Sequence, residues 1–129
     1  LEGALKLKEL SYVHAEGYPA GEMKHGPLAL IEEGMPVVVL APRDNYYKKT
    51  ISNMQEVIAR GGKVLMITDD TSETMSENIR FKFQIPKTNS SINSFLLTIP
   101  IQFLAYHVAL LKNCDIDKPR NLAKSVTVE

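Results

Sequence analysis

The stretch Pro36–Asp69, PVVVLAPRDNYYKKTISNMQEVIARGGKVLMITD, decides the fold. It contains two short apolar runs, Pro36–Pro42 and Lys63–Asp69, which are rich in β-branched residues and typical of strands buried on both faces. The segment between them ends at Gly61-Gly62 and has apolar side chains at helical spacing: Tyr47, Ile51, Met54 and Ile58. Strand, helix and strand in this order predict a parallel α/β sheet with right-handed connections.

The flanking segments predict further elements. Phe81–Pro86 is a more polar run that indicates a third strand near the sheet edge, and Asp44 or Asn45 is expected to cap the helix before Tyr47. Ala4–Glu16 consists of good helix formers and should end at GYPAG, after which KHGP starts a short helix with Pro27 in its first position. A tight turn is therefore expected between two N-terminal helices.

The segment Ile92–Leu111 is long enough to cross a bilayer. Polar or helix-disturbing residues within it argue against a membrane span, because such groups are costly in lipid: Asn93, Ser94, Thr98, Pro100, Gln102 and His107. We therefore expect a buried helix, packed on the sheet on one side and on another subunit or domain on the other. Pro100 should mark a kink or a restart within it.

Composition excludes several classes of function. The 129 residues carry 15 basic and 15 acidic side chains, so there is no basic field for nucleic acid. The single cysteine, Cys114, excludes an internal disulfide and favours a reducing, cytoplasmic compartment. No three His, Cys or acidic residues have metal-ligand spacing, and no glycine-rich phosphate motif is present, so neither metal nor cofactor is expected. Leu1 stands inside a predicted helix without a cap, which predicts a piece of a longer protein.

Three segments go beyond fold class: LEGALKLKELSYVHAEGY (residues 1–18), GEMKHGPLALI (residues 21–31) and DKPRNLAKSVTVE (residues 117–129). Together they resemble the C-terminal end of the glutamine–fructose-6-phosphate aminotransferase (isomerising) family, the glucosamine-6-phosphate synthases. The resemblance covers essentially the whole chain. It implies a three-layer, flavodoxin-like sugar isomerase (SIS) fold without its first strand, with residues 1–114 as the second SIS subdomain and residues 115–129 as a tail that contributes to the active site.

The resemblance also implies an activity. Members of this family release ammonia from glutamine in a separate domain and use it to convert fructose 6-phosphate into glucosamine 6-phosphate for amino sugar synthesis. The glutaminase domain and the first SIS subdomain, which holds the phosphate loop, are not in this sequence. The chain by itself is therefore expected to be inactive, and to work as part of a homodimeric, cytoplasmic enzyme.

Site residues follow from the positions that match the family. Glu9 matches the general base between C1 and C2 of the sugar, and Lys6 matches a lysine with an auxiliary role in proton transfer. His25 matches the histidine linked to opening the sugar ring, which serves the active site of the neighbouring subunit. Lys124 matches the lysine that forms a Schiff base with fructose 6-phosphate, and Ala123 matches a backbone contact to the substrate.

Simpler interpretations stand beside these roles. Glu9 and Lys6 could be a solvated ion pair at i,i+3 spacing, and His25 and Lys124 could be ordinary structural and tail residues. His14 and His107 lie on or near predicted apolar helix faces and are expected in the core or an interface, with Cys114 structural. Two other functions remain open: a regulatory SIS module that binds a sugar phosphate without converting it, and a structural dimerisation domain.

Overall fold

The computed structural model describes residues 1–72 and 79–120. The polar segment TSETMSEN (residues 71–78) predicts a loop or a short helical turn, and its part beyond Ser72 lies outside these residues. The tail after Arg120, with its predicted site residues, also lies outside them. The chain forms two compact units, Leu1–Gly17 with the chain from Ile101 onward, and Tyr18–Pro100. Each unit is described by itself.

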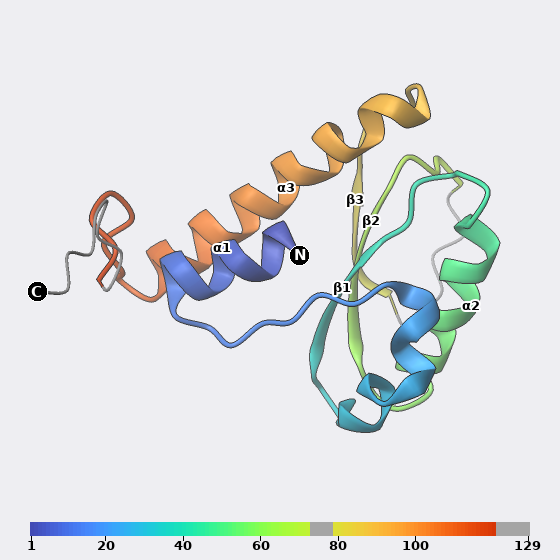
Figure 1. Cartoon of the computed structure of the whole chain (residues 1–129), viewed down its shortest axis with the longest axis horizontal. Coiled ribbons are helices and arrows are strands. Elements are labelled where there is room, and N and C mark those ends of the chain that lie inside the picture. The colour runs from blue at the N-terminus through green and yellow to red at the C-terminus, as the bar shows by residue number, and fades with distance from the viewer. Residues whose placement is uncertain (73–78, 121–129) are drawn as a thin grey trace, which may run out of the picture. The chain divides into compact units, whose positions relative to one another are not determined.

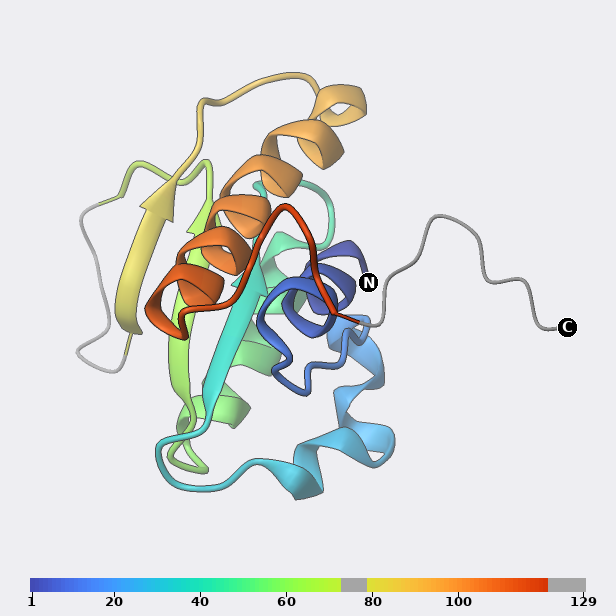
Figure 2. The ribbon, with the colours of Figure 1, turned by 90° about the vertical axis from the view of Figure 1, so that its left-hand side faces the viewer.

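The larger unit contains a three-stranded parallel sheet in the order β1-β2-β3 (Figure 2). Its strands are β1 (Pro36–Leu40), β2 (Lys63–Thr68) and β3 (Ile79–Gln84). Leu65 of β2 pairs with Val38 of β1 and with Phe81 of β3, so these side chains share one face. The predicted parallel α/β sheet is confirmed. β3 lies at the predicted sheet edge and begins at Ile79, two residues before the predicted start.

The core of this unit lies on the opposite face of the sheet, beside helix α2 (Tyr47–Ile58) (Figure 1). Met54 and Val57 of α2 pack in one cluster with Val64 and Met66 of β2. Each of these side chains is nearly inaccessible, and burial of an aliphatic side chain stabilises a fold by about 1.5–3 kcal/mol. The predicted apolar face of α2 is therefore confirmed.

Short connections join α2 to the strands. The helix ends before Gly61, whose φ of 85° is a backbone conformation that favours glycine, and the Gly61 carbonyl accepts a hydrogen bond from Gly34 N–H at 2.8 Å. At the other end, Asp44 Oδ1 accepts the Tyr46 N–H at 2.8 Å. Asp44 thus forms a turn before the helix, but α2 has no side-chain cap, so the predicted cap was wrong in detail.

The prediction that β1 is buried on both faces was wrong. Val38 and Leu40 are 38% and 40% exposed, and on the same face Phe81 and Phe83 are 61% and 52% exposed. The physical reason is position: β1 lies at an end of the sheet, and the core cluster that includes α2 gathers on its other face. β2, in the centre, has the burial predicted for it.

The N-terminal helix α1 (Glu2–Ser11) is shorter than predicted. It ends because Tyr12 adopts the left-handed conformation, with φ 54°, and the Leu7 carbonyl accepts hydrogen bonds from Ser11 Oγ at 2.7 Å and from Val13 N–H at 3.3 Å. A hydroxyl that bonds a helix carbonyl in this way competes with continuation of the helix.

An irregular segment, not a tight turn, follows α1 up to Pro19. The short helix predicted from KHGP consists of two 3₁₀ helices, η1 (Ala20–His25) and η2 (Pro27–Leu30), with Pro27 in the predicted first position.

The long helix α3 (Ser90–Leu111) begins directly after Asn89, whose Oδ1 accepts the Ser91 N–H at 3.1 Å. It continues through Pro100 without a restart, one of the two predicted alternatives. Leu97, Ala105 and Ala109 form a buried stripe, whereas other apolar side chains are 42–84% exposed: Ile92, Phe95, Ile99, Phe103, Tyr106, Leu110 and Leu111. The buried stripe agrees with the prediction for one side of the helix, and the predicted packing of the other side on another subunit or domain stays a prediction. In the described part of the chain, α3 is the one helix whose length and composition would suffice for a membrane span, a test that core helices of soluble proteins also pass.

Two histidines that were expected in the core or an interface are exposed in this chain. His14 lies beyond the end of α1, and its side chain is 84% exposed, 3.6 Å from Glu16 Oε1. His107 is also exposed on α3, where its ring stacks with Phe103 and meets Tyr106 edge to face. The core alternative was therefore wrong for both histidines, and the interface alternative stays a prediction.

Candidate functional site

The first candidate site is an ion pair on α1. Lys6 Nζ lies 2.9 Å from Glu9 Oε2, and Glu2 Oε1 is 4.0 Å from the same nitrogen. The spacing of three residues places Lys6 and Glu9 on one side of the helix, as predicted. Their side chains are 33% and 25% exposed, so both are reachable from solvent while held in a defined geometry.

The ion pair fixes the charge of the lysine. The hydrogen bond that Lys6 donates to Glu9 is the main cause that raises the pKa of Lys6, and the charges of Glu9 and Glu2 act in the same direction. Lys6 is therefore a cation and a hydrogen-bond donor at neutral pH, not a base. A pair at this spacing stabilises a helix by only about 0.2–0.5 kcal/mol. This contribution to the stability of α1 is too small to explain the Lys6–Glu9 pair by itself.

The end of α1 also meets the start of the C-terminal tail. The Arg120 N–H donates to Tyr12 Oη at 2.8 Å, and the Arg120 guanidinium carbon lies 4.1 Å from the centre of the Tyr12 ring. Sequence reasoning missed this contact, because nothing local links two residues 108 positions apart. Ala123 and Lys124, the predicted substrate-binding residues, lie outside the described residues, so their roles stay predictions.

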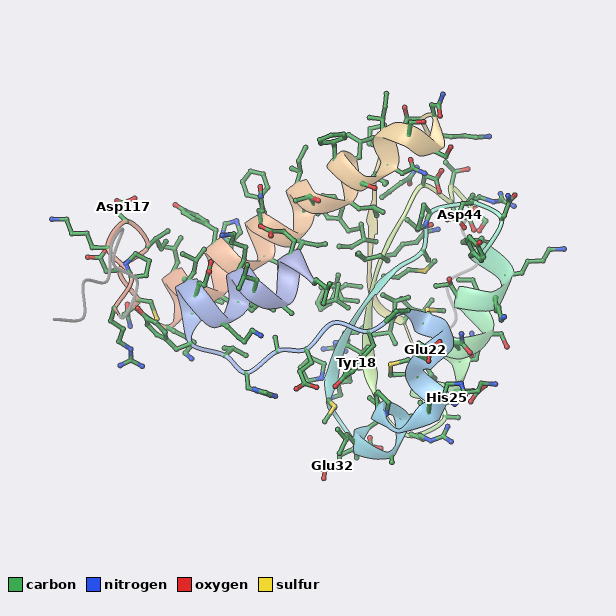
Figure 3. All side chains as sticks on the ribbon, in the orientation of Figure 1. Tyr18, Glu22, His25, Glu32, Asp44 and Asp117 are labelled. Atoms are coloured by element: carbon green, nitrogen blue, oxygen red, sulfur yellow. The ribbon has the colours of Figure 1, made fainter. Side chains whose placement is uncertain are left out.

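His25 is the last residue of η1 and is exposed to solvent (Figure 3). Gly26 follows it with φ 144°, a conformation that favours glycine, and redirects the chain into η2. On the same short helix, Lys24 Nζ forms a 2.6 Å ion pair with Glu56 Oε1 of α2. Lys6 and Glu9 belong to one compact unit and His25 to the other. The structure therefore brings Lys6 and Glu9 together, and the predicted common cleft with His25 stays a prediction.

A second polar cluster, which sequence reasoning missed, lies where β1 and β2 end. Asp70 accepts hydrogen bonds from Tyr47 Oη at 2.6 Å and from Ser72 N–H and Oγ at 3.1 and 2.9 Å, and Arg43 Nη1 is 3.4 Å away. The neighbouring Asp69 accepts the Arg43 N–H at 2.6 Å. The available signal was the pair of acids directly after a buried strand, at the edge where parallel sheets gather polar groups.

The polar and charged groups in this cluster form hydrogen bonds with one another. The Tyr47 hydrogen bond is the largest cause that lowers the pKa of Asp70 to about 2, followed by the Ser72 backbone N–H. Burial, and then the same hydrogen bond, raises the pKa of Tyr47 to about 12. Both shifts share one contribution, the hydrogen bond that the Tyr47 phenol donates to the Asp70 carboxylate. We interpret the cluster as a clamp that ties the β1–α2 loop to the end of β2.

Replacing Tyr47 by Phe is expected to lower the free energy of unfolding by about 1–3 kcal/mol at pH 7, because the buried Asp70 carboxylate loses a hydrogen-bond donor. A carboxyl with a lowered folded pKa stabilises the fold above its unfolded pKa of 3.8, and that contribution disappears as the pH falls through about 2. The difference between wild type and variant should therefore shrink from pH 4 to pH 2.

Urea unfolding at pH 7, 4 and 2 measures this effect. Tyr46→Phe is the matched control, since Tyr46 is the adjacent tyrosine and is 71% exposed. Equal stability of the Tyr47 and Tyr46 variants at pH 7 would show that the clamp contributes nothing.

In the described part of the chain, no three His, Cys, Asp or Glu side chains gather in a way that could hold a metal ion. Cys114 is partly buried just after α3, with Sγ 3.8 Å from the Lys112 carbonyl. No nucleophile arrangement surrounds it among the contacts described.

Comparisons with known proteins extend over the whole chain. The chain is 56% identical over 130 residues to glutamine–fructose-6-phosphate aminotransferase (isomerising) of Rhizobium leguminosarum bv. viciae, and 58% identical to the protein of the same name from Brucella abortus biovar 1 (strain 9-941). Both alignments cover 100% of this chain and 21% of the relative. The chain thus spans about a fifth of the length of these curated relatives.

Solved structures agree with this relationship. The C-terminal domain of glucosamine-fructose-6-phosphate aminotransferase from Francisella tularensis superposes with a TM-score of 0.84 at 45% identity, over 90% of this chain and 33% of that one. Glucosamine-6-phosphate deaminase from Thermotoga maritima gives a TM-score of 0.75 at 30% identity, over 99% and 36% of the two chains. The SIS domain model matches residues 1–112, so this chain, with its parallel α/β sheet, belongs to the SIS domain family.

Proposed function

We propose that this chain forms part of the isomerase half of an enzyme that makes glucosamine 6-phosphate from fructose 6-phosphate and glutamine-derived ammonia. The observation that carries the proposal is the identity of 56–58% to relatives named glutamine–fructose-6-phosphate aminotransferase, over all of this chain. The ion pair on α1 supports it, because it presents a carboxylate and a cation on one side of a helix.

Each residue of the α1 pair has a distinct task. Isomerisation moves a proton between two adjacent sugar carbons, so one carboxylate that reaches both carbons can act as the base and then as the acid. We assign this task to Glu9. Lys6, whose raised pKa keeps it protonated, supplies a nearby positive charge and a proton donor for sugar oxygens.

The remaining roles extend beyond the α1 pair. Lys124 attacks C2 of the open-chain sugar and Ala123 contacts the substrate through its backbone. His25, exposed at the end of η1, assists ring opening in the active site of a second copy of the chain. We place residues 1–114 in the second SIS subdomain and residues 115–129 in the active-site tail, with a first SIS subdomain and a glutaminase domain as further parts of the enzyme.

One experiment tests the activity and the shared site together. The chain replaces its matching 130 residues in the Rhizobium leguminosarum relative, and glucosamine 6-phosphate formation is measured. Chimeras with His25→Ala or Glu9→Gln should each be strongly impaired. Coexpression of the two variants should restore about a quarter of the activity, because half of randomly formed dimers are mixed and each has one intact site.

Controls define what each result means. The unmodified chimera is the positive control, and the isolated chain is expected to form no product, since no phosphate-binding loop is assigned to it. An inactive unmodified chimera would overturn the proposed function. Coexpressed variants that are no more active than the sum of the two parents would overturn the shared site. The single cysteine supports a cytoplasmic location, which cell fractionation checks, with recovery in a membrane or secreted fraction as the contrary result.

A further inference from the structure

Arg120 and Tyr12 make two different contacts with each other. The backbone N–H of Arg120 donates a hydrogen bond to Tyr12 Oη at 2.8 Å, and its guanidinium carbon lies 4.1 Å from the ring centre. The first contact positions the main chain of Arg120, and the second holds its side chain by a cation–π interaction. Both residues belong to the same compact unit. The start of the tail is therefore attached to the end of α1.

The Tyr12 side of this contact is built by the end of α1. Tyr12 has φ 54° and ψ 31°, a left-handed conformation that residues with a side chain seldom adopt. Hydrogen bonds from its own N–H and from Val13 N–H to the Leu7 carbonyl hold it there, next to the fully buried Ser11. The backbone conformation of Tyr12 is thus set by several local hydrogen bonds and does not depend on Arg120.

The turn after α3 determines the backbone path that leads to Arg120. The helix ends at Leu111, Asn113 in the following turn is also left-handed with φ 53°, and the Cys114 N–H donates to the Ala109 carbonyl at 2.9 Å. Asp115 Oδ1 then accepts the N–H groups of Asp117 and Lys118 at 3.0 and 2.9 Å. Pro119 restricts the backbone just before Arg120. The path from α3 to Tyr12 is therefore defined residue by residue.

We propose that Tyr12 and Arg120 form a latch that makes Tyr12 a positioning residue for Lys124. This inference rests on the proposed function. Glu9 precedes Tyr12 by three residues, less than one helical turn, so the latch is next to the proposed base. Lys124 follows Arg120 by four residues, and a fully extended chain carries its Cα at most about 14 Å away. The latch thereby limits the distance between the proposed amine and the proposed base.

A Tyr–Arg contact could also serve stability alone, and the two roles make different predictions. If the latch only stabilises the unit, its loss should leave the chemistry of folded molecules unchanged. If it positions the tail, its loss should slow Schiff-base formation and lower kcat, while the KM for fructose 6-phosphate changes little because its phosphate is bound elsewhere in the enzyme.

The test uses the full-length chimera with Tyr12→Phe, which removes the hydroxyl but keeps the ring, and Tyr12→Leu, which removes both contacts. Trypsin cleavage of the Arg120–Asn121 bond, followed by mass spectrometry, reports release of the latch. When the Tyr12–Arg120 contact opens and closes faster than trypsin cleaves, the cleavage rate follows the fraction of molecules in which the contact is open. We expect an increase of about two- to tenfold for Tyr12→Phe and about five- to fiftyfold for Tyr12→Leu. Tyr46→Leu, at an exposed tyrosine in the other unit, is the control and should cleave as wild type does.

The functional readout is trapping of fructose 6-phosphate by borohydride, together with kcat and KM. Trapping rate and kcat should fall for Tyr12→Leu by up to the factor measured for cleavage, and less for Tyr12→Phe. Unchanged cleavage in Tyr12→Leu overturns the latch. Faster cleavage with wild-type trapping and kcat overturns the positioning role. If the unmodified chimera traps no sugar, the proposed function fails, and this inference fails with it. Failure of the proposed function can be told apart from failure of the latch, because it appears in the unmodified chimera without any Tyr12 substitution.

Discussion

Lys124→Arg in the full-length chimera is expected to abolish the borohydride-reducible adduct with fructose 6-phosphate. Schiff-base formation needs an uncharged amine that can attack C2 and release water, and a guanidinium with a pKa above about 12 stays protonated. Reduction of the wild-type adduct should leave a secondary amine. The peptide containing Lys124 then gains the mass of fructose 6-phosphate less one oxygen atom, because water leaves when the Schiff base forms and reduction adds two hydrogens. The variant should show no such mass.

Two further variants make this test specific. Lys118→Arg changes an exposed lysine six residues earlier in the chain and should keep full trapping. A chimera that ends at Arg120 lacks the amine altogether and should trap nothing, while its sheet unfolds at the wild-type urea concentration. A normal adduct yield in the Lys124→Arg or the truncated chimera would show that the amine comes from another residue.

Glu9→Gln should lower kcat by about 10²–10⁴-fold, the usual effect of losing a general base or acid. This corresponds to about 2.7–5.4 kcal/mol in the activation free energy. The amide oxygen of Gln can still accept the hydrogen bond that Glu9 Oε2 accepts from Lys6, so the helix should keep its geometry. Substrate binding and borohydride trapping should persist, because both precede proton transfer.

Glu2→Gln is the matched control for this substitution. Glu2 is on the same helix and its carboxylate is 4.0 Å from Lys6 Nζ, but the resemblance gives it no role in proton transfer. Its variant should retain kcat within about threefold, as expected for an exposed charge near a site. The measurements are kcat and the exchange of solvent deuterium into C1 of the sugar. A loss of less than tenfold in Glu9→Gln would reassign Glu9 to a structural partner of Lys6.

The fold class was predictable because its signals are local. Apolar runs with β-branched residues identified β2, and apolar spacing identified the packed face of α2 between the two strands. A helical connection of that length between two consecutive strands predicts that the strands are parallel. The same kind of reasoning placed Lys6 and Glu9 on one side of α1, since residues three apart on a helix are always neighbours.

Tertiary structure decided what depends on residues that are distant in sequence. The end of α1 at Tyr12 was missed for a different reason, because it depends on local hydrogen bonds to the Leu7 carbonyl that helix propensity does not encode. The exposure of Val38 in β1 follows from its place at an end of the sheet, although its residues read as a buried strand. The Asp70 clamp joins elements 23 residues apart or more.

By itself, then, the sequence determined the elements, the parallel sheet and the ion pair, because each is set by spacing along the chain. Only the tertiary structure determined the contact of Arg120 with Tyr12, 108 residues away. The physical reason is that a helix or strand fixes its neighbours by its own geometry, whereas a contact between distant segments exists only once the whole unit has folded and brought them together.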